Sequence, residues 1–142
     1  MYEDQLARVE LFENLDKKEV SLLAKTCTER QFAAGAVLMQ EGEAGAGLFI
    51  LIEGKVHITQ SAGHGQPPRD IATLGAGEVI GEMALLDDLP RSATVTAIDP
   101  CRCLLVPVWD FRATLRESPD IAIKLLSQLS RRLRKTEQQL HQ

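Results

Sequence analysis

The stretch that decides the fold runs from residue 81 to residue 95 and reads Gly81-Glu82-Met83-Ala84-Leu85-Leu86-Asp87-Asp88-Leu89-Pro90-Arg91-Ser92-Ala93-Thr94-Val95. It places one carboxylate, one guanidinium, one hydroxyl and several amides on a turn between apolar runs. Gly81 lets the backbone bend or approach a ligand without a Cβ clash. The residues after Glu82 can begin a short helix, whose first N–H groups lack partners within the helix and attract an anion. Arg91 can hold that anion with its planar fork of donors.

Glu82 has a different role in this interpretation, because a carboxylate repels a phosphate. It is suited to accept a hydrogen bond from a hydroxyl such as the 2′-OH of a ribose, and a phosphate site beside a ribose acceptor describes a nucleotide pocket. The alternative is a surface ion pair between Glu82 and Arg91, worth about 0–1 kcal/mol. The glycine before Glu82, the small residues after Arg91 and the strand pattern on both sides favour the pocket.

This stretch resembles the phosphate-binding cassette of cyclic nucleotide-binding domains. The family pattern is Gly-Glu-(apolar)-(small)-(apolar), a variable stretch, and then Arg-(Ala/Ser/Thr)-Ala. The resemblance covers nearly the whole chain, including the glycines at 35, 42, 54 and 77, and Ile80 departs from it where many members carry an aromatic residue. It implies contacts to the cyclic phosphate from Arg91, Ser92 and the amides of Met83, Ala84 and Ala93, and contacts to the ribose from Gly81 and Glu82.

Composition excludes several functions. The 142 residues are 44% hydrophobic and 25% charged, which is ordinary for a soluble globular protein. A formal net charge of −4 gives no general attraction to nucleic acid or to anionic membranes. No apolar run approaches the ~20 residues that span a bilayer. The N-terminus has no signal-peptide pattern, so we expect a cytoplasmic location and no membrane partner.

The residues that commonly bind metals or catalyse reactions form no recognisable set. Three cysteines without a Cys-x-x-Cys spacing are expected to be reduced and buried, with Cys27 on a helix face and Cys101 and Cys103 on one face of a strand. The three histidines have no metal-ligand spacing, so we expect no metal. No Ser/His/Asp or Cys/His set is apparent, so we expect no catalytic residues and no enzyme.

Short β-prone segments alternate with Gly-rich turns between residues 32 and 106, which predicts a β-sandwich or barrel. The expected strands are 37–39, 48–52, 56–59, 71–74, 79–80, 94–97 and 103–106, with a polar surface loop at 61–68 and a flexible turn at 45–47. A first helix is predicted from the spacing of Leu6, Val9 and Phe12. A second is predicted from the capping box of Asp16 and Glu19, and it should end near residues 28–31.

The C-terminal part is predicted to be helical. A short helix covers 107–116, and Ser118-Pro119-Asp120 then begins a longer one. Along this helix, residues recur at alternating spacings of 4 and 3 and form a heptad seam, which is typical of helices that pack around each other. The seam consists of Ala122, Leu126, Leu129, Leu133, Thr136 and Leu140. We expect the seam leucines to join two copies in a homodimer; the alternative is a lone helix that packs on its own barrel. The basic run 131–135 is expected to flank the seam in solvent.

This helix resembles the dimerisation helix of the catabolite activator family. The resemblance implies that Thr136 contacts the base of the nucleotide and that Arg132 lies near the ribose and Glu82. A family serine near the base is replaced by Glu137. Independently, a threonine in a leucine seam is costly unless its hydroxyl meets a ligand, and the alternative is a polar residue that sets the register.

The fold class is therefore α+β: an antiparallel, jelly-roll-like β-roll with N-terminal helices and a long C-terminal helix. We expect a single domain over 1–142, divided into 1–31, 32–106 with its cassette at 81–95, and 107–142. The predicted function is a cyclic mononucleotide sensor that signals by repositioning its last helix and needs no cofactor. Its ligand is cyclic AMP, with cyclic GMP as the alternative because Ser92 can also accept from a guanine amino group.

Two other functions stay open. The chain can be the sensor part of a transcription regulator that acts with a DNA-binding partner, or an orphan protein-interaction domain with a weak pocket. In the catabolite activator family a helix-turn-helix DNA reader follows the long helix. We expect no direct DNA binding by residues 1–142, and the sequence identifies no downstream effector.

Overall fold

The computed structural model describes residues 1–87 and 89–141, and these residues form two compact units. One unit joins Met1–Thr26 to Trp109–Gln142, and the other is Cys27–Val108. Asp88, which lies within the stretch singled out from the sequence, is outside the described residues, as is Gln142. The first unit is helical and the second is built from strands, so the α+β class predicted from the sequence is confirmed.

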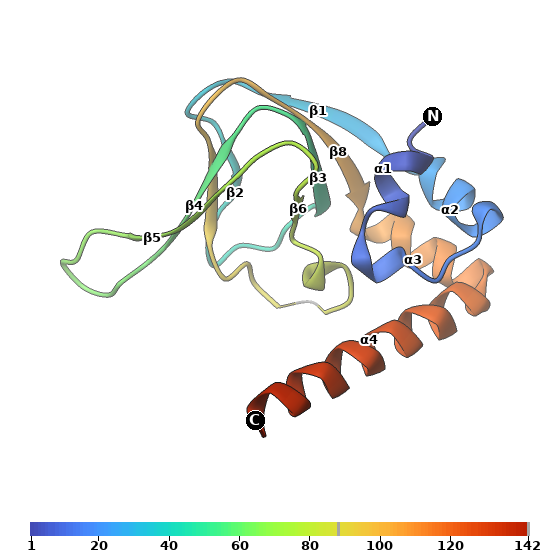
Figure 1. Cartoon of the computed structure of the whole chain (residues 1–142). Helices are drawn as coiled ribbons and strands as arrows, with labels where there is room; N and C mark the ends of the chain where they lie inside the picture. The colour runs from blue at the N-terminus through green and yellow to red at the C-terminus, as the bar shows by residue number, and fades with distance from the viewer. Residues whose placement is uncertain (88, 142) are drawn as a thin grey trace. The chain divides into compact units, whose positions relative to one another are not determined.

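The β unit contains two four-stranded antiparallel sheets (Figure 1). The first sheet has the order β1-β8-β3-β6, with bounds Thr28–Phe32, Cys101–Pro107, Gly47–Glu53 and Val79–Ile80. The second has the order β2-β7-β4-β5, with bounds Val37–Met39, Thr94–Ala97, Val56–Gln60 and Arg69–Leu74. Sequential strands therefore alternate between the sheets at several points, as the predicted jelly-roll-like β-roll requires.

The core of the β unit comes from apolar residues of several strands, above all β3 and β8. In β3 the sequence Gly-Leu-Phe-Ile-Leu-Ile-Glu lies between β8 and β6, and its first five residues are buried. The rings of Phe32 and Phe49 meet edge to face with centroids 5.8 Å apart, a favourable aromatic geometry. The buried cluster consists of Met39, Phe49, Leu51, Val56, Ile80, Val95, Ala97, Cys101, Cys103 and Leu105.

The β4–β5 hairpin extends beyond the rest of the β unit (Figure 1). It pairs Val56 with Leu74 at its base and Gln60 with Arg69 near its tip, with a register shift between Ile58 and Thr59. The polar loop predicted at 61–68 connects the two strands. β5 is the edge strand of its sheet and is mostly exposed.

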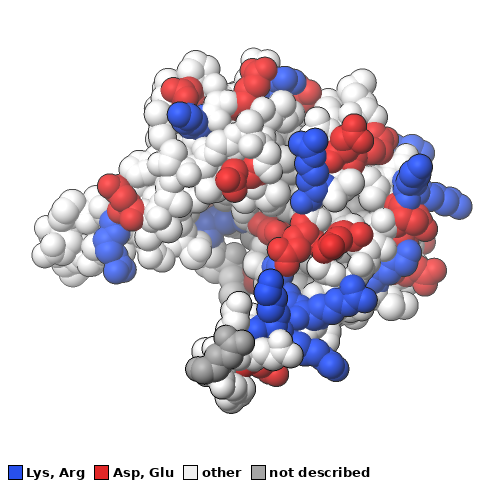
Figure 2. Space-filling model, viewed as in Figure 1, with Lys and Arg blue, Asp and Glu red and all other residues white. Residues whose placement is uncertain are grey.

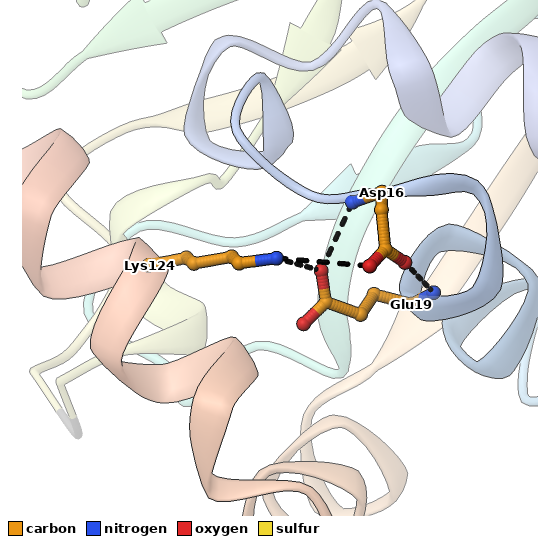
Figure 3. A network of polar contacts seen from close by, with 3 residues as sticks. All are labelled: Asp16, Glu19 and Lys124. Atoms are coloured by element: carbon orange, nitrogen blue, oxygen red, sulfur yellow. Dashed lines mark hydrogen bonds and ion pairs between the residues drawn. The ribbon is translucent and has the colours of Figure 1, made fainter.

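The helical unit contains α1 (Glu3–Ala7), η1 (Glu10–Phe12), α2 (Lys17–Ala24), α3 (Val108–Glu117, whose first residue belongs to the β unit) and α4 (Pro119–Leu140). The predicted capping box is confirmed: the Glu19 amide donates to Asp16 Oδ1 at 2.8 Å, and the Asp16 amide donates to Glu19 Oε1 at 2.9 Å. Lys124 of α4 joins this cap, with its Nζ 2.5 Å from Glu19 Oε1 and 3.8 Å from Asp16 Oδ2 (Figure 3). The cap of one helix therefore also fixes a second helix.

Some expected boundaries were wrong. α2 ends at Ala24 rather than near 28–31, so Cys27 lies outside the helix and residues 28–32 form β1, which pairs with β8. Strand pairing overrides the local helical pattern there. The first predicted helix divides into α1 and η1, because Val9 has an extended backbone between them.

α4 has two different long faces. Ile121, Leu125 and Gln128 are buried, whereas the seam residues Leu126, Leu133 and Leu140 are 66%, 60% and 77% exposed. Ile123 is exposed as well.

Polar contacts join α4 to the segment before α2. Gln128 accepts from Asn14 Nδ2 at 2.9 Å and donates to Glu13 Oε2 at 3.2 Å, and Arg132 Nε lies 3.4 Å from Glu10 Oε1. Basic side chains gather along α4 on the face drawn in Figure 2.

Candidate ligand-binding site

The predicted cassette connects the two sheets of the β unit. It leaves β6 at the edge of the first sheet, passes through the short helix η2 (Met83–Leu85), and enters β7 inside the second sheet. Leu85 is buried in this turn, and Val95 at its end is in the core. Buried apolar side chains therefore anchor the turn at two points, and Arg91 and Ser92 lie between them.

Gly81 allows the sharp start of this turn. Its φ is +80°, in the left-handed region that a residue with a side chain rarely adopts. Glu82 then has helical backbone angles, and its carbonyl accepts from the Leu85 amide at 3.3 Å. Glu82 is partly buried, and Met83 is about half exposed. Ala84 lies within η2, and its side chain is outside the described set.

The structure brings Arg91 back to the start of the cassette. Its Nη1 donates to the carbonyl of Gly81 at 3.2 Å, across ten positions of sequence. Its Nη2 donates to the carbonyl of Gly47 in a short hydrogen bond. The residue is only 7% exposed. A cation has therefore been placed inside the fold, held by two backbone carbonyls.

Within the described part of the chain, one donor of the Arg91 guanidinium has no acceptor. Its Nε is buried and has no hydrogen-bond partner among the described residues, and within 1–87 and 89–141 no ion pair of this guanidinium is recorded. Burial lowers the pKa of Arg91 from its ordinary value, while the nearby charge of Asp87 acts in the opposite direction. A buried, unpartnered donor is costly, and an anion that reached it would remove that cost.

A second segment of the site escaped sequence reasoning. The loop at 42–47 pairs with the backbone of Arg91: the Gly42 amide donates to the Arg91 carbonyl at 2.9 Å, and the Arg91 amide donates to the Glu43 carbonyl at 3.0 Å. Gly45 lies directly against the guanidinium. The sequence indicated only a flexible Gly-Ala-Gly turn here, and the one usable signal was two glycines in front of a buried strand.

The residues after Arg91 turn toward the β4–β5 hairpin. Ser92 is exposed, and its carbonyl accepts from Gln60 Nε2 at 3.1 Å. Ala93 is partly buried, and Thr94 Oγ1 accepts from the Glu41 amide at 3.0 Å. Gln60, which sequence reasoning did not single out, thus links the hairpin to the cassette.

The two residues implied as base contacts belong to the other compact unit. Thr136 is exposed, and its hydroxyl donates to the carbonyl of Arg132 one turn earlier in α4 at 3.0 Å. Arg132 forms the ion pair with Glu10 described above. Within the helical unit, both side chains therefore have local contacts.

The cysteines are free thiols in the structure. Cys101 and Cys103 are buried in β8, as predicted, whereas Cys27 is partly exposed. Burial raises the pKa of Cys103 to about 11, and the neighbouring Cys101 acts in the same direction. A thiol with this pKa is protonated at neutral pH, so its nucleophilicity is low. Among the described residues, no group of three or more His, Cys, Asp and Glu side chains has the geometry to hold a metal ion.

The fold and this geometry define a class: a β-roll whose two sheets are joined by a turn that carries a buried arginine. Residues 29–118 match the family model described as "Cyclic nucleotide-binding domain". Because the match covers more than half of the chain, the protein belongs to the cyclic nucleotide-binding domain family. The resemblance stated from the sequence is thereby confirmed. No helix within 1–87 and 89–141 is both long and apolar enough to cross a bilayer.

Relatives include regulators from several organisms. The chain is 35% identical over 130 residues to the "Cyclic AMP receptor protein" of Thermus thermophilus, covering 92% of this chain and 60% of the relative. The N-terminal domain of a transcriptional regulator from Streptomyces coelicolor A3(2) has 34% identity and a TM-score of 0.86, with coverage of 96% of this chain and 95% of that one. The regulatory domain of Toxoplasma gondii PKA, crystallised with cAMP, has 31% identity and a TM-score of 0.72, with coverage of 89% and 49%.

Proposed function

We propose that this protein binds a cyclic mononucleotide, with cyclic AMP preferred over cyclic GMP, and that Arg91 holds the cyclic phosphate. The observation that carries the proposal is the buried guanidinium with an unpartnered Nε inside the family's cassette. A phosphate oxygen is a strong acceptor for this donor, and its charge would balance the buried cation. The name of the Thermus relative and the cAMP complex of the Toxoplasma domain support the choice of cyclic AMP.

The other cassette residues have roles that follow from their positions. Ser92 and the amides of Met83, Ala84 and Ala93 are proposed to complete the phosphate contacts, and Gly81 with Glu82 to bind the ribose. Glu82 is partly buried on the turn that also contains the guanidinium, so a ribose and a phosphate can be recognised together. Arg132 and Thr136 are proposed to meet the ribose and the base. The cyclic nucleotide is proposed as a ligand without any further cofactor, and no catalytic role is proposed.

We further propose that the chain acts as a single sensor domain in the cytoplasm, as a homodimer joined by α4. Three leucines on one stripe of α4 are more than half exposed, and a second copy of the stripe would cover them. Two of the relatives are named as regulators of transcription or as parts of one. This chain spans about 60% of the length of the curated relatives it matches first, so action with a DNA-binding partner is the second candidate function.

Calorimetric titration with cyclic AMP and cyclic GMP tests the proposal. Arg91→Ala should lower the affinity by roughly two to four decades, because removing one partner of a buried charge pair costs about 3–5 kcal/mol. Arg102→Ala is the matched control: Arg102 lies in the same unit, but its guanidinium pairs at the surface with Glu29 and Glu53. Near-wild-type affinity of Arg91→Ala would contradict the phosphate site, and failure of both nucleotides to bind the wild-type protein would favour the orphan interpretation.

A further inference from the structure

The absence of a side chain at residue 45 has a structural role beside Arg91. A Cβ built on Gly45 would overlap the Nε, Nη2 and Cζ atoms of that guanidinium. The backbone of Gly45 has no positive φ, so the glycine is not needed there for conformational freedom. Close approach of the arginine is the reason that remains for a glycine at this position.

Backbone atoms of Gly45, Gly47 and Gly81 surround the guanidinium, and these three residues are called its seat below. The carbonyl of Gly81 accepts from Nη1, the carbonyl of Gly47 accepts from Nη2, and Gly45 lies against the guanidinium. Backbone hydrogen bonds to Gly42 and Glu43 fix the main chain of Arg91 to the same loop. Two of the five N–H donors are thus committed to carbonyls, and Nε is left without a partner.

We infer that Gly45 is a positioning residue for the anion site, because its missing side chain leaves room for the Arg91 guanidinium to reach the carbonyls of Gly81 and Gly47. This inference rests on the proposed nucleotide function and adds a residue to it. The loop at 42–47 is then part of the binding site although it need not touch the ligand. A side chain at residue 45 would expel the guanidinium from the seat and separate it from both carbonyls.

The collision falls on the tip of a flexible side chain rather than on backbone, so Gly45→Ala should fold. Gly75→Ala is the matched control, since Gly75 also lacks a positive φ and a Cβ there would meet nothing within 4 Å. We expect Gly45→Ala to reduce the affinity for cyclic AMP roughly tenfold to a hundredfold, as for loss of hydrogen bonds to a charged group. Gly75→Ala should bind as the wild type does.

A measurement on the ligand-free protein tests the role of Gly45 independently of nucleotide binding. In ¹⁵N–¹H spectra, the Nε–H signal that disappears in Arg91→Ala should be protected from solvent exchange in the wild type and in Gly75→Ala. It should exchange rapidly in Gly45→Ala. Protection that persists in Gly45→Ala, or affinity equal to that of Gly75→Ala, would overturn the role of Gly45.

Two further results distinguish a failure of the proposed function from a failure of the role of Gly45. If the wild type binds no cyclic nucleotide, the proposed function fails, while the exchange of Nε–H still decides whether the seat exists. If Gly45→Ala is unfolded, adding Arg91→Ala should restore folding, because the colliding atoms are gone. A double variant that stays unfolded would show that Gly45 is needed for another reason.

Discussion

The buried side chain of Arg91 is in an energetically unfavourable environment. A guanidinium is buried with two carbonyl acceptors, and its Nε has no partner among residues 1–87 and 89–141, although a polar atom without a partner normally reduces stability. Residues of this kind are expected at functional sites, where the missing partner is the ligand. The same reasoning predicts how the neighbouring residues respond to substitution.

Glu82 provides a test of the ribose contact. Glu82→Gln should weaken binding of cyclic AMP by about 1–2 kcal/mol, because an acceptor oxygen remains but its charge is lost. A 2′-deoxy ligand should lose affinity with the wild type but little more with Glu82→Ala. Calorimetry on the four combinations gives the coupling, and simply additive losses would show that Glu82 does not meet the hydroxyl.

We expect the buried thiol of Cys103 to make the folded protein less stable at alkaline pH. Its pKa in the folded state is about 11, above the ordinary value of a thiol, so only the unfolded chain releases this proton between about pH 9 and 11. The stabilisation from the buried thiol is thus complete below about pH 8.5 and is lost as the pH rises toward 11. Denaturant unfolding should show that the wild type loses about 2 kcal/mol more than Cys103→Ala between pH 8 and 10.5. Equal pH dependence would contradict this assignment.

At the level of elements, the cap of α2 connects two ends of the chain. Asp16 and Glu19 form the capping box, and Lys124 of α4 binds the same carboxylates (Figure 3). Hydrogen bonding to the Glu19 amide lowers the pKa of Asp16, and the hydrogen bond to Glu19 raises that of Lys124. The charged forms are therefore the ones that the folded state favours.

Two substitutions separate the cap from the ion pair. Asp16→Ala should lower Tm by several degrees, while Asp16→Asn should lower it less, because asparagine also caps helices but carries no charge for Lys124. Since the pKa of Asp16 is depressed, its contribution is present above about pH 4 and is lost as the pH falls through the folded pKa. Thermal unfolding from pH 3 to pH 7 should therefore be less pH-dependent in Asp16→Asn, and an unchanged profile would contradict this.

The elements also show how far sequence reasoning reaches. Strands whose residues are apolar or β-branched, such as β2, β6 and β7, were predicted with their observed bounds, and so was the cap of α2. β1 was missed because its residues are polar and mostly exposed, and only pairing with β8 makes it a strand. Arg91 was predicted from its motif to bind an anion. The hydrogen bond from its Nη2 to the Gly47 carbonyl could not be predicted, because the two residues are 44 positions apart in the sequence.

At the level of the whole molecule, one face of α4 contacts its own unit and another face is exposed. Gln128 and Lys124 bind the segment between Glu13 and Glu19, whereas Leu126, Leu133 and Leu140 remain exposed. Burying each leucine would contribute roughly 1.5–3 kcal/mol, enough for three per chain to favour a twofold contact between copies.

Leu129→Glu tests both the dimer and its proposed link to the nucleotide. It places like charges opposite each other in the seam and should give a monomer in light scattering, whereas Ser127→Glu, on an exposed position of the same helix outside the seam, should remain dimeric. If Thr136, further along α4, meets the base, dimer and ligand are reciprocally coupled, typically by about 1–3 kcal/mol. The monomer should then bind cyclic AMP roughly 5- to 150-fold more weakly, although Arg91 and its seat are unchanged. Calorimetry on both variants measures this, and a monomer with unchanged affinity would leave nucleotide binding to the β unit alone and disprove the coupling through α4.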